Sequence, residues 1–168
     1  FYAGAREMDL EPLSFFTDQV NRARELGVPA AAHLPFFELA PGSPDSMILS
    51  ATRKRFARTM DLMQELNPAH MVGHVDYRFV IHQERFDEWL ERSATTWQGL
   101  AETWPGHAPL YLENTFEPDP DPLRKLLDAS GVGAEIDIDA LPLSLALQSQ
   151  FGSEDAVRFA LTGGDDYE

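Results

Sequence analysis

The sequence contains no cysteine, no long hydrophobic run and few basic residues. The absence of cysteine excludes disulfides and thiolate metal sites, and it is typical of a protein from the reducing cytoplasm. No apolar run approaches the ~20 residues that span a bilayer, so we expect no membrane partner. The formal net charge is −15. Nucleic-acid binding needs a basic surface, so we expect no nucleic-acid partner either.

The length and composition fit one compact domain: the chain has 168 residues, 43% of them hydrophobic. Its last third, from residue 117 onward, is the more acidic part. The chain begins at Phe1 without an initiator methionine and ends at Glu168, shortly after a glycine pair. We expect both ends to be cut.

Helical and apolar segments alternate along the chain. Helical spacing predicts helices at residues 11–26, 46–66, 84–104, 123–129, 143–151 and 154–161, and apolar runs predict strands at 29–34, 71–75, 110–112 and 132–138. No strand precedes the first helix unless residues 1–5 are its remnant. This alternation predicts an α/β fold with a parallel sheet of about four strands.

Three potential metal ligands end three of these strands: His33, His74 and Glu113. Functional groups collect at the carboxyl ends of parallel strands, so we expect them to meet. Imidazole and carboxylate donors suit Zn²⁺ or Mn²⁺. The alternative is that each histidine is a hydrogen-bonded structural residue, although Glu113 is harder to explain as core. Asp137 is the next candidate ligand in order.

Five other titratable residues are interpreted as structural or surface residues at least as readily as ligands. Asp45 and Asp76 are as well explained as loop hydrogen-bonding residues as they are as ligands. His70, His82 and His107 are expected on the surface.

One ordered set of segments resembles the xylose-isomerase-like TIM barrels, which include sugar isomerases and epimerases and the AP endonucleases. The set comprises His33-Leu34-Pro35-Phe36, Gly42-Ser43-Pro44-Asp45, a helix with Arg53, the strand into His74, and Glu113-Asn114-Thr115. The likeness covers about residues 8–130 and implies the amino-terminal half of a barrel. It also implies that a His and a Glu at these places bind metal or substrate. Four further strands complete the family's site, and this chain has room for about one. The likeness therefore implies a vestigial, weak site.

A second likeness covers about residues 129–168. The run from Ala129 to Ser144 and the block from Ala156 to Glu168 resemble the carboxyl-terminal domain of thiamine-monophosphate kinase. We carry over no catalytic or cofactor-binding residue from it. The chain then divides into residues 1–128, a half-barrel segment, and residues 129–168, a kinase-derived segment packed on the same sheet. The seam lies near Ser130, and we interpret the whole as a chimera.

Three functional hypotheses follow. The first is a recombinant folded fragment without native enzymatic activity, requiring no cofactor and binding Zn or Mn weakly. The second is a divalent-metal-dependent sugar isomerase or epimerase completed by oligomerisation. The third is a phosphate- or nucleotide-binding remnant of the kinase. An open half-barrel leaves sheet edges exposed, so self-association into a homodimer or a larger oligomer is expected.

Overall fold

Four parallel strands form one sheet in a computed structural model of the chain, which describes residues 1–104, 109–115, 117 and 120–135. The strands are β1 (Ala32–His33), β2 (Met71–His74), β3 (Leu110–Glu113) and β4 (Gly133–Glu135). They lie side by side in chain order, β1-β2-β3-β4, and every neighbouring pair is parallel. This arrangement confirms the predicted α/β fold and its sheet of about four strands.

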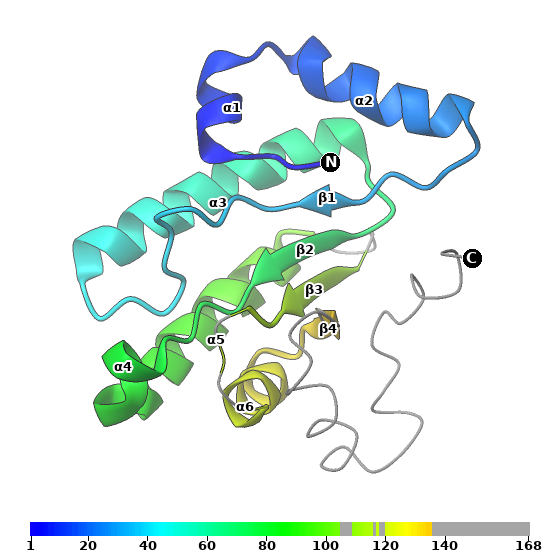
Figure 1. Cartoon of the computed structure of the whole chain (residues 1–168). Helices are drawn as coiled ribbons and strands as arrows, with labels where there is room; N and C mark the ends of the chain where they lie inside the picture. Colours follow the sequence, from blue (N-terminus) through cyan, green and yellow to red (C-terminus); the bar gives the residue numbers. More distant parts are fainter. Residues whose placement is uncertain (105–108, 116, 118–119, 136–168) are drawn as a thin grey trace, which may run out of the picture.

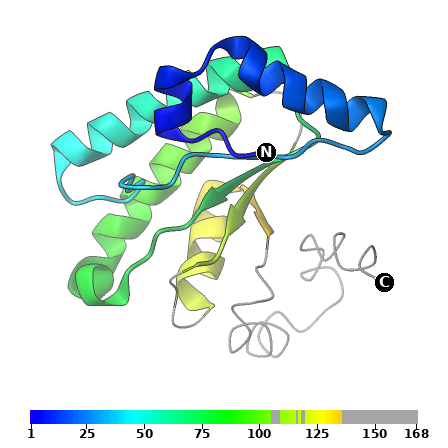
Figure 2. The ribbon, with the colours of Figure 1, turned by 45° about the horizontal axis from the view of Figure 1, so that its top comes forward.

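The helices follow one another along the sheet in the same order as the strands (Figures 1 and 2). They are α1 (Ala5–Leu10), α2 (Leu13–Glu25), α3 (Ser46–Leu66), α4 (Phe79–His82), the short 3₁₀ turn η1 (Gln83–Arg85), α5 (Phe86–Glu102) and α6 (Asp121–Ser130). Helix α2 contacts α3, α3 contacts α5, and α5 contacts α6. This regular progression of strand and covering helix is the architecture of part of a barrel.

Helix α3 shows how local sequence sets an element's bounds. Asp45 caps its start, with one carboxylate oxygen accepting hydrogen bonds from the backbone N–H groups of Met47 (2.7 Å) and Ile48 (3.3 Å). Asn67 ends it in the left-handed conformation at φ 46°. Between the caps, residues at helical spacing face the core: Leu49, Phe56, Met60, Met63 and Leu66.

The sheet packs tightly on α5 at Gly73 in β2. A Cβ at this position would lie 2.6 Å from Cη2 of Trp97, a fully buried residue of α5. The bare backbone therefore lets the indole approach the strand directly before His74. The same contact fixes the distance between α5 and the strand that carries a candidate ligand.

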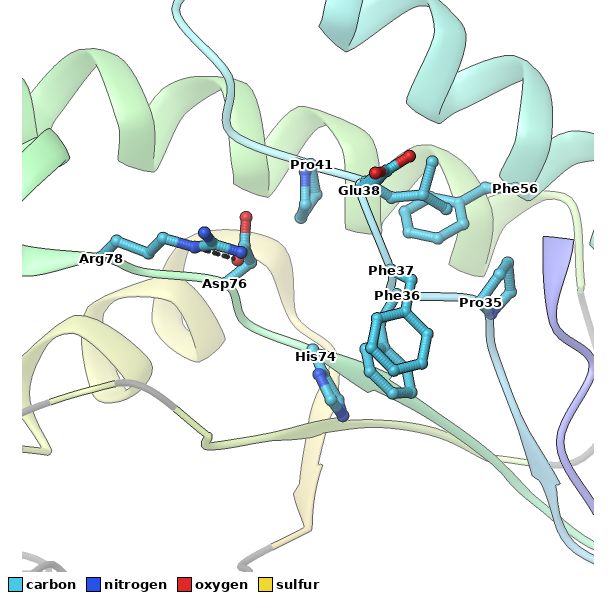
Figure 3. A pocket seen from close by; sticks show the side chains of 10 residues that line it. Pro35, Phe36, Phe37, Glu38, Pro41, Phe56, His74, Asp76 and Arg78 are labelled. Atoms are coloured by element: carbon cyan, nitrogen blue, oxygen red, sulfur yellow. Dashed lines mark hydrogen bonds and ion pairs between the residues drawn. The ribbon is translucent and has the colours of Figure 1, made fainter.

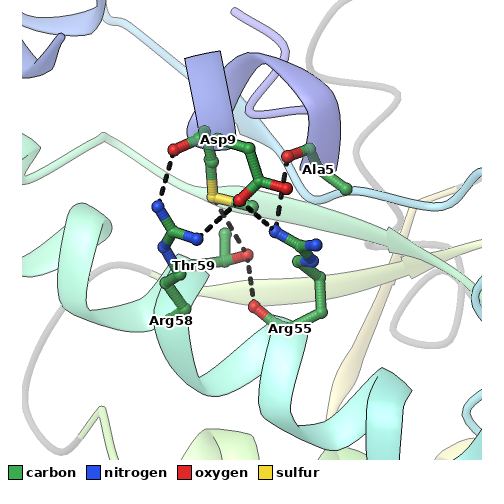
Figure 4. A network of polar contacts seen from close by, with 6 residues as sticks. Ala5, Asp9, Arg55, Arg58 and Thr59 are labelled. Carbon is green, nitrogen blue, oxygen red and sulfur yellow. Dashed lines mark hydrogen bonds and ion pairs between the residues drawn. The ribbon is translucent and has the colours of Figure 1, made fainter. Parts of the chain in front are cut away.

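The amino terminus differs from the single helix predicted at residues 11–26, because a second helix, α1, precedes α2. Before α1, Tyr2 forms a parallel bridge with His33, so residues 1–5 do contain a strand-like remnant. Two arginines of α3 hold α1 in place (Figure 4). Nη1 of Arg55 and Nη1 of Arg58 donate to Oδ1 of Asp9 at 2.7 and 2.6 Å.

Several predictions fall outside the described residues. The predicted strand at 132–138 is represented by β4, and the helices at 143–151 and 154–161 lie beyond the described part. Asp137 and His107 lie outside it as well. The division at residue 128 therefore stays a prediction. In the part of the chain that the structure describes, no helix has the length and apolar character to cross a membrane.

Candidate metal centre

The three predicted ligands meet at one point. Nε2 of His33 lies 3.2 Å from Oε2 of Glu113, and Nε2 of His74 lies 3.1 Å from the same oxygen. The potential ligand atoms of all three residues lie within 4.8 Å of one another. The structure thus brings together residues separated by up to 80 positions in the sequence.

The sheet register explains why the three side chains share a face. His74 pairs directly with Glu113 across β2 and β3. His33 pairs with Val72, two residues before His74. Side chains alternate between the faces of a strand, so Val72 and His74 share one face and His33 joins them. Parallel strand direction then places all three at the same carboxyl edge of the sheet.

Each imidazole is oriented by a different contact. Nδ1 of His33 lies 2.8 Å from the carbonyl oxygen of Leu34, which can only accept, so this nitrogen carries a proton. A hydrogen bond from Nε2 to Glu113 then requires a second proton on the ring, and release of that proton frees Nε2 to bind a metal ion. His74 is held instead by Phe36, whose ring stacks on it at 4.1 Å between centroids and 25°. Nδ1 of His74 is buried without a hydrogen-bond partner among the described residues.

Glu113 is electrostatically prepared to act as an anionic ligand. Hydrogen bonds from His33 and then from His74 lower the pKa of its carboxyl group from 4.5 to about 2, against the opposing effect of burial. The carboxylate is therefore ionised throughout the neutral range. Its side chain remains 20% exposed, which leaves a path to solvent.

This donor set fits a divalent transition metal. Two imidazole nitrogens and one carboxylate oxygen form a common three-residue catalytic site for Zn²⁺, with further positions open to water or substrate. The Leu34 carbonyl fixes the His33 tautomer in the way that carbonyl groups support histidine ligands in metal sites. Among the described residues, no other histidine, aspartate or glutamate joins the cluster.

A small pocket opens beside His74 (Figure 3). Its cavity volume is about 80 Å³, and its walls combine aromatic and charged side chains, among them Phe36, Phe37, Asp76 and Arg78. Nε of Arg78 donates to Oδ1 of Asp76 at 3.0 Å. Burial raises the pKa of Asp76, while Arg78 acts in the opposite direction. The pocket therefore lies directly beside one of the three predicted ligands.

Asp45 and Asp76, for which the sequence left both a hydrogen-bonding role and a ligand role open, differ in the structure. Asp45 is a helix cap, as a hydrogen-bonding role predicts. Asp76 lies in the pocket in a left-handed conformation (φ 54°), which a non-glycine residue rarely adopts and which clusters at functional sites. It pairs with Arg78 and does not join the ligand cluster.

The expected surface position of His82 is wrong. The residue is only 5% exposed, and its Nδ1 accepts a hydrogen bond of 3.0 Å from the backbone N–H of Arg78. Its ring packs beside those of Tyr77 and Trp89, with centroids 5.7 and 5.9 Å away, and burial lowers its pKa. The helical turn α4 buries His82. The apolar Phe79-Val80-Ile81 run in the sequence did not predict that turn. His70, also expected at the surface, is half-buried.

Sequence reasoning also missed Glu117. This carboxylate is 8% exposed and accepts from the backbone N–H groups of Tyr77 (3.0 Å) and Thr115 (2.6 Å). Glu117 lies four residues after Glu113. A second acidic residue so soon after a strand-end glutamate was the sequence signal that could have identified it.

Comparison with known proteins supports both resemblances. No family model matches the chain. The TTHB071 protein from Thermus thermophilus, from a crystal soaked with ZnCl₂, superposes with a TM-score of 0.60 at 24% identity, covering 80% of this chain and 54% of that one. A D-tagatose 3-epimerase-like protein gives 0.59 at 20% identity, covering 73% and 50%. A D-psicose 3-epimerase crystallised with D-fructose gives 0.65 at 15%, covering 95% and 58%.

The second likeness is to thiamine-monophosphate kinase. The Salmonella typhimurium and Escherichia coli enzymes are each 48% identical over 46 residues, which is 27% of this chain and 14% of each kinase. The chain thus spans about half the length of the solved structures and a small part of the kinases. Its described part shares the fold of these solved structures, as part of a TIM barrel, and a stretch of 46 residues resembles thiamine-monophosphate kinase.

Proposed function

We propose that His33, His74 and Glu113 hold one divalent transition-metal ion, Zn²⁺ or Mn²⁺, and hold it weakly. The observation that carries this proposal is the convergence of two imidazole Nε2 atoms on one carboxylate oxygen, with all three ligand atoms within 4.8 Å. The ionised state of Glu113 adds support, because a metal ligand must be deprotonated.

Weak binding is proposed because part of the expected site is missing. Three protein ligands are available among the described residues. The family likeness implies four further strands that complete the site, whereas the described residues contain only β4 after Glu113. Ligands need support that holds them within about 0.5 Å of their productive positions, and part of that support is absent from the described residues. We therefore propose that the chain has no enzymatic turnover of its own.

The alternative is a divalent-metal-dependent sugar isomerase or epimerase completed by a second copy of the chain. The pocket beside His74 favours it, because a ligand there would reach the ion. The bound ion would supply Lewis-acid polarisation of a carbonyl oxygen. Phe36 would hold His74, Leu34 would hold His33, and the Asp76–Arg78 pair would bind and orient polar groups of the ligand.

We further propose that the chain is a chimera that joins a half-barrel to a kinase-derived segment beginning near residue 129. The support is that two unrelated likenesses occur in one chain of 168 residues. The matched stretch amounts to 14% of the kinase, so phosphate or nucleotide binding remains the weakest of the three hypotheses. Self-association stays part of the proposal, since the described sheet ends at β4 on one side.

Isothermal titration calorimetry tests the metal site. Zn²⁺ and Mn²⁺ are titrated into the wild type, into a His74→Ala/Glu113→Ala double variant, and into a His70→Ala/Glu102→Ala control that removes the same residue types elsewhere. We expect dissociation constants weaker than about 1 μM, corresponding to less than about 8 kcal/mol, in wild type and control. Binding should be lost in the site variant. Equal binding in all three proteins would refute the site.

Activity and size measurements separate the two leading functions. Sub-micromolar binding together with C3 epimerisation of a ketohexose would support the enzyme and contradict the inert fragment. Light scattering tests the association, and a strictly monomeric protein at high concentration would contradict it.

A further inference from the structure

Glu117 forms a bridge between the two loops that follow β2 and β3. One carboxylate oxygen, Oε1, accepts from the backbone N–H of Tyr77 at 3.0 Å. The other, Oε2, accepts from the backbone N–H of Thr115 at 2.6 Å. The side chain belongs to neither the ligand cluster nor the walls of the pocket. Its role is therefore separate from direct contact with an ion.

The two donors lie directly beyond the two ligands. Tyr77 is three residues past His74, and Thr115 is two residues past Glu113. The sheet ladder between β2 and β3 continues as far as the hydrogen bond from the Val75 N–H to the Glu113 carbonyl, at 3.1 Å. The Glu117 carboxylate then ties the chains together after the strands have ended.

The backbone turn at Asp76 makes this bridge possible. Asp76 adopts a left-handed conformation at φ 54°, between His74 and the bonded N–H of Tyr77. A conformation of this kind persists only when surrounding contacts hold it. The hydrogen bond to Glu117 and the ion pair of Asp76 with Arg78 are two such contacts. Glu117 thus supports the loop that follows His74 and carries the pocket's charged pair, Asp76 and Arg78.

We infer that Glu117 is a positioning residue for the metal site: its buried carboxylate holds together the two loops that follow His74 and Glu113, and so keeps the paired strand ends that carry these ligands from separating. This inference rests on the proposed metal-binding function. The physical reason is that an ionised carboxylate can accept two N–H groups at once, through charge-assisted hydrogen bonds. An amide offers one acceptor oxygen and turns an NH₂ group toward the other N–H. Residues that orient metal ligands commonly change metal affinity about 10–100-fold when altered.

Co²⁺ titration tests the inference, because Co²⁺ occupies Zn²⁺-type sites and its visible absorption reports ligand number and geometry. The proteins are wild type, Glu117→Gln, Glu117→Asp and the matched control Glu102→Gln, whose carboxylate is exposed on α5. The shorter aspartate keeps the charge but does not reach both loops. We expect Co²⁺ affinity to fall about tenfold or more in both Glu117 variants, with an altered visible spectrum. The control should match wild type.

Far-UV circular dichroism of each metal-free protein separates a positioning effect from unfolding. A loss of Co²⁺ affinity in either Glu117 variant, with an unchanged circular dichroism spectrum, supports the inference. Wild-type affinity and absorption in both variants would overturn it. A wild-type protein that binds no Co²⁺ would instead overturn the proposed metal site, and the inference with it. If wild type binds Co²⁺ and both Glu117 variants bind it equally well, the positioning role is overturned while the proposed metal site stands.

Discussion

Replacement of Glu113 by glutamine should make the metal-free protein less stable in a way that depends on pH. Glutamine keeps the shape of the side chain but removes its charge, so it removes the charge-assisted acceptance from His33 and His74. The pKa of Glu113 is lowered from 4.5 to about 2 in the folded protein. A group with a depressed folded pKa contributes stability above its unfolded pKa, and that stability is lost as the pH falls toward the folded pKa.

The magnitude follows from these two values. At about 1.4 kcal/mol per pH unit, the shift corresponds to about 3 kcal/mol near pH 6, with the side chain only 20% exposed. The same linkage leaves about 1.4 kcal/mol at pH 3. Wild type and Glu113→Gln should therefore differ by about 3 kcal/mol near pH 6 and by about 1.4 kcal/mol at pH 3.

Urea unfolding of both proteins, in the presence of EDTA, measures this difference at each pH. Taking the difference cancels the titration of the many other acids of this chain, because both proteins share them. Glu102→Gln serves as the control, and its difference from wild type should stay small and constant. A Glu113→Gln difference that is near zero at pH 6, or that stays constant down to pH 3, would refute the hydrogen-bonded arrangement of the three residues.

Three further substitutions test other parts of the structure. Gly73→Ala places a methyl group against the buried Trp97 ring and should cost about 1–3 kcal/mol in urea unfolding; a neutral effect would contradict this close packing. Asp45→Ala removes a helix cap and should cost about 1 kcal/mol, whereas Asp45→Asn should retain most of the stability. Phe36→Leu removes the ring stacked on His74 and should weaken Zn²⁺ binding severalfold by calorimetry, with Phe36→Tyr close to wild type. Equal binding by the leucine and tyrosine variants would count against a role for the stacked ring.

The strands and long helices were predictable because their signals are local. Apolar runs end at His33, His74 and Glu113, and α3 lies at the predicted residues because Asp45 and Asn67 cap a periodic apolar face. The helix α1 was missed because its short segment is stabilised by distant arginines of α3, a contact with no local signature. His82 was misplaced for a similar reason: the turn of α4 and the rings of Tyr77 and Trp89 bury it.

The sequence by itself determined that this chain alternates helices with parallel strands and that two histidines and a glutamate end successive strands. These features follow from side-chain periodicity and from the rule that parallel strands share a carboxyl edge. Only the tertiary structure decided that both Nε2 atoms approach the same oxygen of Glu113, that the Leu34 carbonyl fixes one imidazole, and that Glu117 joins two loops. Such contacts depend on sheet register and loop conformation, which distant residues set through packing and which no local pattern encodes.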